Sequence, residues 1–561
     1  MRQPFVSLAL LFNACVASAG FGPPAPAPAP PSAPAPPSAP APPFAPAPPG
    51  PKVPDGFVLS TFVAAPQIKS PASIAAAPDG KIFVGEDEYN TQPDRAPGLS
   101  RVKLCVDTDG DGRADRLTVY ADRVNSPQGM TCVAGTLYVA HAPLLTAFRD
   151  TDGDGVADER TDLVTGLGPV PQGLVHHVPS GLRMGIDGWL YISIGDKGIE
   201  QATGADGRQV SLWGGGVVRV RPDGTRMELF SARTRNTYDV AIDPYIDAYT
   251  RDNTNDGNGW DSRVALMQRG GEYGYPSLYK SWGDEIVAPL ASYGSGSATG
   301  SMYLHDPSWP AGFGDALYTC DWVRGFVYRH VLTRKGAGHE LTQDEFMKEV
   351  RPTDLDSDAQ GRMYVADWGR RDWGTAPAVG TIYRVETARP STRPVAATQP
   401  FPKHLRGASR EELLTWLASP SAVWRLEAQQ ELVRRRGREA GPSPDVSAAL
   451  VAMARKKVLD PRARIAALFA LKQLDGEGAT PALAALAALP ELRAHAIRAL
   501  VDRDDQLAGV DAQLIAGALH DEDPRVRVQA AIAAGQLGQP RLAAAAAAAL
   551  GPLTADADGF V

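Results

Sequence analysis

One phrase recurs six times along the chain, and this repeat constrains the fold more than any other feature. It consists of a small-residue turn, an apolar pair, Asp-Gly or a substitute, and an alternating segment that ends near an Asp. The copies span residues 73–88, 129–142, 181–196, 239–253, 312–322 and 354–369. Aromatic and β-branched residues alternate within each copy, which predicts two short strands joined by a turn.

Further hairpins lie between the copies, at 214–230 and 380–386. Four strands per unit, repeated about every 50 residues, are typical of a β-propeller. The sequence therefore predicts a mainly β domain, a six-bladed β-propeller over residues 53–387. A β-sandwich would not explain six copies of one phrase.

Two nearly identical acidic loops begin 43 residues apart, at 107–115 and 150–158. Their position in consecutive repeats predicts equivalent hairpin turns. Positions 1, 3, 5, 6 and 9 match a calcium loop, but position 12 is Thr118 or Thr161, where an EF-hand has Glu. Two interpretations stay open, a calcium site or residues that merely favour a turn. The candidate ligands are Asp107, Asp109, Asp111, Asp115, Asp150, Asp152, Asp154 and Asp158.

The last third of the chain has a helical pattern. "DPRARIAALFALKQLDG" at 460–476 and "DPRVRVQAAIAAGQLG" at 523–538 share an Asp cap, a Pro at the first position, an apolar stripe and a final Gly. After a linker at 388–404, residues 405–555 are predicted to form an all-α solenoid of HEAT-like repeats. We expect about four helix pairs followed by an Ala-rich helix, with a surface for a protein partner.

The N-terminus reads as an export signal. Arg2, an apolar run and "ASA" predict a signal peptide over 1–19. Residues 20–52 are rich in Pro and Ala and predict a stiff, extended tether. We expect an exported protein, either periplasmic or at the cell surface or secreted; lipidation at Cys15 is an alternative. No later stretch reads as a membrane span.

The net charge and the cysteine content make some classes of function less expected. The net charge of −8 gives no pull toward nucleic acid. Beyond the signal peptide, Cys105, Cys132 and Cys320 allow one disulfide at most. No C-x-x-C-H motif is present, so we expect no covalent haem in this chain and a separate electron acceptor for any redox chemistry.

Three places could carry chemistry. His176 and His177 precede a strand that ends at Asp196, and a loop histidine is either a general base or a turn cap. The segment 233–276 contains Arg235-Asn236 and an oxygen-rich loop that is either a hard-cation site or a solvated loop. Finally, Arg324 and Arg351 would suit a polycarboxylate ligand.

Residues 55–386 resemble the soluble quinoprotein glucose and sorbosone dehydrogenase superfamily. The closer resemblance is to the membrane-bound dehydrogenase domain of planctomycete and verrucomicrobial type, which commonly precedes HEAT-like repeats. The motifs that carry it are "IDGWLYISIGD", the Arg-Asn pair before "AIDP", and "GGEYGYP".

The resemblance implies the cofactor pyrroloquinoline quinone (PQQ) with calcium. It implies that His177 is catalytic, that Arg235, Asn236 and Arg351 contact PQQ, and that main-chain groups near Asn253 and Thr254 bind calcium. This chain departs from the pattern in two places. The usual "SGRL" is "SGLR", which shifts Arg183, and Thr353 stands where the family has a second arginine.

The function expected from these features is oxidation of a sugar or other alcohol or aldehyde at the mouth of the propeller channel. In the implied mechanism, calcium polarises a quinone carbonyl, His177 removes the hydroxyl proton and hydride passes to the quinone. One alternative is a non-catalytic scaffold in which the propeller binds carbohydrate or protein. Another is a metal-dependent lactonase.

Overall fold

The computed structural model describes most of the chain beyond residue 49. The described residues are 50–88, 100–169, 177–253, 261–277, 285–369, 379–388, 401–402, 405–437 and 444–538, with the single residues 544 and 548. The predicted signal peptide and nearly all of the tether lie outside these ranges, as do His176 and Thr254.

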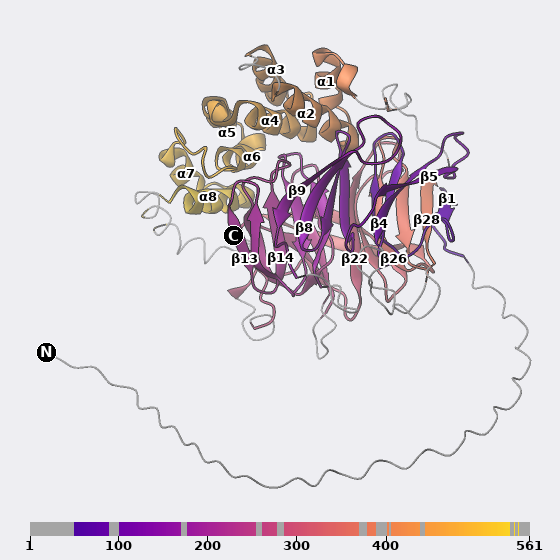
Figure 1. Cartoon of the computed structure of the whole chain (residues 1–561). Coiled ribbons are helices and arrows are strands. Elements are labelled where there is room, and N and C mark those ends of the chain that lie inside the picture. Colours follow the sequence, from indigo (N-terminus) through magenta and orange to yellow (C-terminus); the bar gives the residue numbers. More distant parts are fainter. Residues whose placement is uncertain are drawn as a thin grey trace, which may run out of the picture. The chain divides into compact units, whose positions relative to one another are not determined.

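Six antiparallel sheets form the blades of a propeller (Figure 1). Blade 1 contains β2 (Pro71–Ala76), β3 (Ile82–Glu86), β4 (Arg101–Val106) and β5 (Arg116–Ala121). Blade 2 contains β6 (Gly129–Val133), β7 (Thr136–His141), β8 (Leu144–Arg149) and β9 (Glu159–Thr165), and is widened by β12 (Ile199–Gly204) and β13 (Gln209–Leu212). Blade 3 contains β10 (Pro179–Met184), β11 (Leu190–Ile194), β14 (Gly215–Val220) and β15 (Glu228–Thr234), with β20 (Gly271–Glu272) parallel at its edge.

The remaining three blades complete the ring. Blade 4 contains β16 (Asn236–Thr237), β17 (Ala241–Ile242), β18 (Ala248–Asn253), β19 (Arg263–Met267) and β21 (Ala291–Ser292). Blade 5 contains β22 (Ala298–His305), β23 (Asp315–Asp321), β24 (Phe326–Lys335) and β25 (Gly338–Lys348). Blade 6 contains β26 (Pro352–Ser357), β27 (Met363–Asp367) and β28 (Thr381–Thr387), and its outer strand is β1 (Phe57–Ala64).

The repeated phrase covers the innermost strand and its neighbour in five blades, and in blade 5 the copy at 312–322 covers only the second strand, β23. The innermost strands β2, β6, β10, β17, β22 and β26 contact their neighbours in a closed ring. The prediction of six blades is therefore confirmed. Apolar side chains fill the space between neighbouring blades in six separate clusters, which is how a propeller divides its core.

The C-terminal region contains eight α-helices within its described residues. They are α1 (Arg410–Leu417), α2 (Ala422–Arg436), α3 (Pro444–Arg455), α4 (Pro461–Asp475), α5 (Thr480–Ala487), α6 (Pro490–Leu500), α7 (Ala512–Ala518) and α8 (Pro524–Leu537). Each odd-numbered helix contacts the next even-numbered one, and the even-numbered helices contact each other in series. This stacking of four pairs agrees with the helical repeats expected from the sequence.

The helix boundaries follow from the motif that the sequence showed. The side chain of Asp460 accepts a hydrogen bond from the backbone N–H of Arg462, and Pro461 opens α4. Asp523 and Pro524 do the same for α8, and Gly538 ends it in a left-handed conformation with φ 57°. Caps of this kind satisfy N–H groups that the first helical turn leaves without partners.

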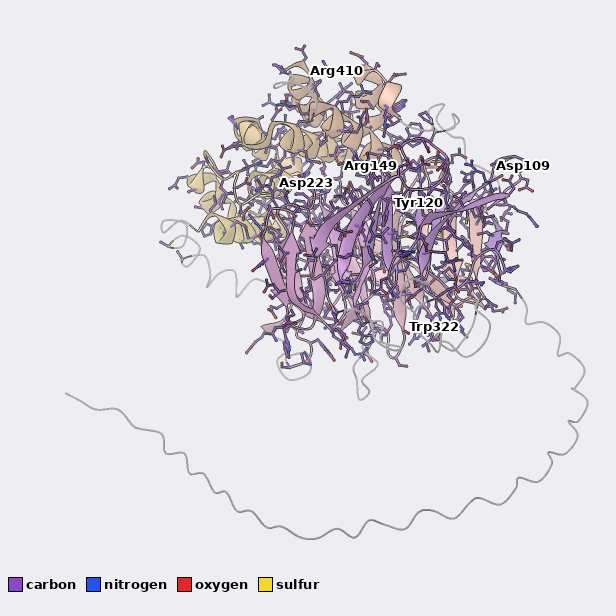
Figure 2. The ribbon with its side chains drawn as sticks, in the orientation of Figure 1. Asp109, Tyr120, Arg149, Asp223, Trp322 and Arg410 are labelled. Atoms are coloured by element: carbon purple, nitrogen blue, oxygen red, sulfur yellow. The ribbon has the colours of Figure 1, made fainter. Side chains whose placement is uncertain are left out.

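The helices cover one face of the propeller, the face on which the first two strands of each blade are joined (Figure 1). Gln429 of α2 and Gln473 of α4 both donate to the carbonyl of Ile186 in the β10–β11 turn, at 2.7 and 3.1 Å. The indole N–H of Trp424 donates to the carbonyl of Ala359 in the β26–β27 turn at 2.9 Å. The opposite face, where Trp322 lies, is the one away from these helices (Figure 2).

Side chains fill the central channel in two layers. On the side of the open face, the Tyr238 hydroxyl donates to Oε1 of Gln128 at 2.8 Å, which spans blades 4 and 2. Beneath it, Arg183 of β10 reaches Asp239 at 3.0 Å and Asp354 at 3.3 Å, and lies 3.7 Å from Asp356. The channel is therefore filled, and any ligand that binds at its mouth lies on top of this plug.

All three cysteines in the described residues are free thiols: Cys105 and Cys320 are buried and Cys132 is partly buried. The disulfide that their number allowed is not formed. Among the described helices, none has the length and apolar character needed to cross a bilayer.

Candidate functional site

A histidine and an aspartate form a hydrogen-bonded pair on the open face of blade 3. His177 lies just before β10, and Asp196 follows β11, so the pairing of these two strands brings them together. Nδ1 of His177 is bound to Oδ1 of Asp196, and the side chains are 27% and 19% exposed. A carboxylate on Nδ1 fixes the imidazole so that Nε2 is the free nitrogen, which is the arrangement of a general base.

Two further side chains surround Asp196. The hydroxyl of Tyr275 lies 3.5 Å from its Oδ2. Burial acts to raise the pKa of Asp196, but the hydrogen bond and charge of His177, together with the charge of Arg235, lower it below its usual value. The carboxyl group therefore stays ionised and can hold a proton on Nδ1 of His177.

Gly195 allows the backbone segments of this site to pack closely against one another. A Cβ at this position would lie 2.5 Å from the carbonyl carbon of His177 and 2.7 Å from Oδ1 of Asn236, so only glycine fits. His177 and Asn236 thus both lie against Gly195 and are close to each other in space. Oδ1 of Asn236 is buried and has no hydrogen-bond partner among the described residues. A buried acceptor of this kind points to a ligand or water in the functional state.

Arg235 and Asn236 are held against the end of β18. Asn236 of β16 pairs with Asn253, and Nη1 of Arg235 donates to the carbonyl of Asn253 at 3.3 Å. Nδ2 of Asn253 donates to Oγ of Ser297 at 3.3 Å. The structure therefore brings Arg235, Asn236 and Asn253 together, whereas Thr254 and the oxygen-rich loop lie outside the described residues.

The two arginines of blades 5 and 6 are anchored to backbone carbonyls of the same face. Arg324 donates to the carbonyls of Tyr293 at 2.5 Å and Ser295 at 2.8 Å. Arg351 donates to the carbonyls of Trp322 and Val323 at 2.9 and 3.0 Å. Arg324 also lies 3.8 Å from a carboxylate oxygen of Asp321, so part of its charge is balanced within blade 5.

The two positions at which the chain departs from the family pattern have structural roles. Arg183 is committed to the plug described above and does not reach the open face. Thr353 donates its hydroxyl to the carbonyl of Pro71 at 2.7 Å and joins blade 6 to blade 1. Neither residue is available to a ligand at the His177 site.

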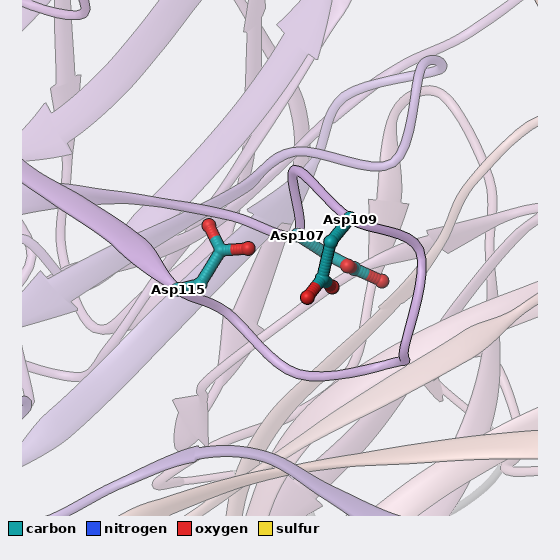
Figure 3. Close-up of side chains that lie close together, drawn as sticks. All are labelled: Asp107, Asp109 and Asp115. Carbon is teal, nitrogen blue, oxygen red and sulfur yellow. The ribbon is translucent and has the colours of Figure 1, made fainter.

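The two acidic loops are equivalent turns on the outside of the propeller, as the sequence predicted. Residues 107–115 join β4 to β5, and residues 150–158 join β8 to β9. Carboxylate oxygens of Asp107, Asp109 and Asp115 lie within 4.8 Å of one another, and those of Asp150, Asp152 and Asp158 do the same (Figure 3). Asp111 and Asp154 instead accept backbone N–H groups two residues ahead, at 2.8 and 2.7 Å.

Each acidic loop packs against the preceding blade, but the side chains that it meets there differ between the two loops. The backbone N–H of Ala114 donates to the carbonyl of Phe62 in blade 6, and that of Ala157 donates to the carbonyl of Tyr120 in blade 1. In the first loop a guanidinium nitrogen of Arg384 lies 3.6 Å from Asp107. The neighbour of the second loop is neutral, because the Thr118 hydroxyl donates to the carbonyl of Gly155 at 2.6 Å.

Asp196 and Tyr275 are the site residues that the sequence analysis did not assign. Asp196 is the last residue of the "ISIGD" strand, and Tyr275 lies in the "GGEYGYP" motif. A carboxylate that ends a propeller strand on the same face as a loop histidine is the signal that could have identified the pair.

Solved structures similar to this chain include several propellers. One is a PQQ-bound aldose sugar dehydrogenase from Streptomyces coelicolor, with 17% identity over 60% of this chain and 100% of that chain and a TM-score of 0.44. Another is a carbohydrate-active enzyme of family AA12 from Trichoderma reesei, with 13% identity, 60% and 98% coverage and a TM-score of 0.44. A third is the PQQ domain of pyranose dehydrogenase from Coprinopsis cinerea, with 12% identity, 60% and 97% coverage and a TM-score of 0.42.

No curated protein matches the sequence of this chain. A family model does match it, over residues 51–371, and these include every strand of the six blades except β28. The chain therefore belongs to the family described as a domain of unknown function, DUF7133.

Proposed function

We propose that this chain is an exported dehydrogenase that uses PQQ and calcium to oxidise a sugar or another alcohol or aldehyde. The observation that carries the proposal is the His177–Asp196 pair beside Arg235 and Asn236 on the open face. The sequence motifs implied catalysis by His177 and cofactor contact by Arg235 and Asn236, and Asp196 is added to them by the structure.

The donor set fits a multiply anionic quinone. Arg235, Arg324 and Arg351 supply guanidinium groups on this face, and carboxylates and carbonyls of a cofactor would find charged donors in them. The oxygen of the buried Asn236 amide has no partner among the described residues; as an acceptor it suits a hydroxyl or N–H group of a ligand, or a metal ion. When bound, PQQ would supply a two-electron acceptor for hydride, and calcium would polarise it.

His177 acts on the substrate hydroxyl. Asp196 accepts a hydrogen bond from the Nδ1–H group, so the lone pair of Nε2 is free to take the hydroxyl proton as the C–H bond breaks. His177 would hold this proton while the alcohol becomes a carbonyl, and the bound quinone would supply the acceptor for the hydride.

A carbohydrate-binding scaffold is the second candidate, and an exposed tryptophan favours it. Trp213 is 66% exposed and is covered only in part by Arg233, whose guanidinium lies 5.3 Å from the ring centroid. A Cβ on the next residue, Gly214, would lie 4.0 Å from the carbonyl oxygen of Tyr275, so the backbone beside Trp213 is close to the segment that contains Tyr275. An exposed indole offers a flat apolar surface to a sugar ring whether or not the sugar is oxidised.

The test is an aldose-oxidation assay with protein reconstituted with PQQ and calcium and with an artificial electron acceptor. The two variants are His177→Ala and, as the matched control, His176→Ala. We expect His177→Ala to lower turnover on the order of 10²–10⁴-fold while PQQ still binds, which is the usual contribution of a positioned base. The control should retain activity.

The outcomes of this assay distinguish between the two candidate functions. Equal activity in the two variants would rule out His177 as the base. A parent protein that binds PQQ but oxidises no sugar or alcohol would contradict the dehydrogenase proposal. Sugar binding without oxidation, lost in Trp213→Ala, would establish the scaffold function instead.

A further inference from the structure

A cavity of about 330 Å³ lies on the helix-covered side of the molecule, far from His177 in the fold. It is enclosed by blades 2 and 3, by α2 and α4, and by the segment that follows α6. Figure 2 shows Arg149 and Asp223, two of its lining residues, where the helices meet the propeller. Its volume is at the lower end of the range for small-molecule sites.

The lining of this cavity is strongly basic. Among the described residues that line it, Asp223 is the sole carboxylate, whereas five are arginines: Arg149, Arg221, Arg226, Arg434 and Arg503. Three of the five have acidic partners. Arg149 lies 3.9 Å from Glu159, Arg226 is paired with Asp505, and Arg434 is paired with Glu431.

The other two arginines, Arg221 and Arg503, have less negative charge beside them than these three. Arg221 donates to the backbone carbonyl of Asp187 at 3.1 Å and is 8% exposed. The Nε atom of the Arg503 guanidinium is buried and has no hydrogen-bond partner among the described residues. Burial and then the charge of Arg503 lower the pKa of Arg221 to about 10. Burial, opposed in part by Asp502, lowers the pKa of Arg503.

The acids in the layer behind the cavity supply only part of the compensating charge, because other arginines share them. There Asp187, Glu228 and Asp502 are the buried acids, and each already faces Arg219, at 3.7, 2.6 and 3.5 Å. Arg269 also pairs with Glu228 and Arg498 with Asp187, so these three acids serve three other arginines. Acids at the rim, such as Asp504, are 44% exposed and are screened by solvent.

The cavity also has an apolar wall, formed by residues of blades 2 and 3 and of α2. These are Val133, Tyr138, Met184, Pro222 and Val433. An inorganic ion would leave this wall in contact with water. The combination of arginine donors on one side and apolar surface on the other suits a molecule with a charged group and an organic body.

We propose that this cavity binds a small organic molecule that carries a phosphate or sulfate group. Arg221, Arg434 and Arg503 would be the donors, since a buried excess of positive charge is costly unless an anion compensates it. Nη1 of Arg434 and Nε of Arg503, both buried without partners in the described structure, would gain them. The ligand would touch propeller and helices together. This site is independent of the dehydrogenase proposal, because it lies on the opposite face.

The test is isothermal calorimetry at low ionic strength with inorganic phosphate, sulfate, glucose 6-phosphate and neutral glucose as probes. The variants are Arg503→Gln and Arg434→Gln. Arg208→Gln is the matched control, because Arg208 pairs with Asp504 at 2.8 Å in the same region but does not line the cavity. We expect both cavity variants to weaken anion binding about tenfold or more, since each loses a charged donor.

The probes also identify the class of ligand. Tighter binding of glucose 6-phosphate than of inorganic phosphate supports an organic ester, and equal binding of the two supports the oxyanion group alone as the recognised part. Binding of neutral glucose with the same affinity would overturn the proposal. No binding of any anion, or an equal loss in Arg208→Gln, would also overturn it.

Thermal unfolding provides an independent measurement. Without added anion, Arg503→Gln should melt at the same temperature as the parent or higher, because it removes a charge that burial disfavours. Saturating phosphate should raise the melting temperature of the parent but not of the variant. A variant that is less stable than the parent without anion would show that Arg503 has a structural role and no anion to bind.

Discussion

The indole N–H of Trp189, in blade 3, donates to the carboxylate of Asp502, in the helical region, at 2.8 Å. Both residues are at most 2% exposed, and the same carboxylate lies 3.5 Å from Arg219. Propeller and helices are therefore joined by a buried polar contact, and its removal leaves the indole N–H without an acceptor and Arg219 with one acidic partner fewer.

Replacing Asp502 should therefore lower the stability of the folded protein. We expect Asp502→Leu to lower the free energy of unfolding by about 3–5 kcal/mol, the usual effect of removing one partner of a buried ion pair. Urea denaturation of the purified chain measures it. Asp504→Leu is the control, and because Asp504 is 44% exposed its loss should cost under about 1 kcal/mol. Equal effects would show that the Trp189–Asp502 contact adds nothing.

The His177–Asp196 pair should respond to mutation of the carboxylate. In Asp196→Asn the amide can donate to Nδ1, which moves the imidazole proton to Nε2 and removes the base. We expect turnover to fall on the order of 10²–10⁴-fold, with PQQ binding retained. Tyr275→Phe is the control, since its 3.5 Å contact with Asp196 is long, and it should change turnover little.

The same pair predicts an acid-side pH dependence. The folded pKa of Asp196 is lower than its unfolded value, so the pair stabilises the protein above about pH 3.8 and the stabilisation is lost as pH falls through the folded pKa. In His177→Ala, NMR titration should find the pKa of Asp196 closer to its ordinary value. An unchanged Asp196 pKa in this variant would contradict the contact.

The two acidic loops should bind calcium with different affinities. Arg384 lies 3.6 Å from Asp107 and opposes a cation in the first loop, whereas the second loop has a neutral neighbour. Calcium titration of Asp109→Asn leaves only the second loop intact, and Asp152→Asn leaves only the first. We expect tighter binding in Asp109→Asn, and Arg384→Gln should strengthen the first loop. If neither single-loop variant binds calcium, the loops are only turns.

Glu427 of α2 should make stability fall as pH rises. Burial raises its pKa to about 7, although its carboxylate accepts the backbone N–H of Ala134 at 3.0 Å. Between about pH 4.5 and 7 the unfolded chain has released a proton that the folded chain still holds, so stability decreases across this range. Glu427→Gln should remove this dependence and gain on the order of 2 kcal/mol at pH 8. Parallel curves for parent and variant would contradict it.

The positive charge of Arg183 should be essential to the stability of the channel plug. Without it, Asp239, Asp354 and Asp356 remain as buried carboxylates with no cation in contact, so Arg183→Met should cost about 3–5 kcal/mol. Burial already raises the pKa of Asp354. Adding Asp354→Asn to Arg183→Met should therefore recover part of the loss, and denaturation of the two variants measures the recovery. A double variant less stable than the single one would contradict this account.

The blades could be predicted because each repeat carries its own local signal. An Asp-Gly turn between two alternating segments specifies a hairpin within 16 residues, as in 181–196, and needs no distant contact. The same holds for α4 and α8, whose Asp-Pro caps are local. Local chemistry therefore predicted the architecture of both regions.

Contacts between distant segments could not be predicted in the same way. Asp196 was visible at a strand end, but its partner is known only once β10 and β11 pair. Arg183 looked displaced from a ligand site, and only the ring of inner strands shows that it faces carboxylates of blades 4 and 6. The docking of Trp189 on Asp502 joins residues more than 300 positions apart, and no short pattern encodes it.

The closure of blade 6 determines the order in which this chain can complete its fold. Phe57 of β1 pairs with Thr387 of β28, about 330 residues later, so the first strand to be synthesised is among the last to find its partner. Until then its edge and that of blade 1 stay open to other chains. Contacts this distant in sequence slow folding and lengthen exposure to aggregation. Ring closure has to wait until nearly 390 residues have been synthesised, which makes assistance by chaperones an expected part of the folding of this chain.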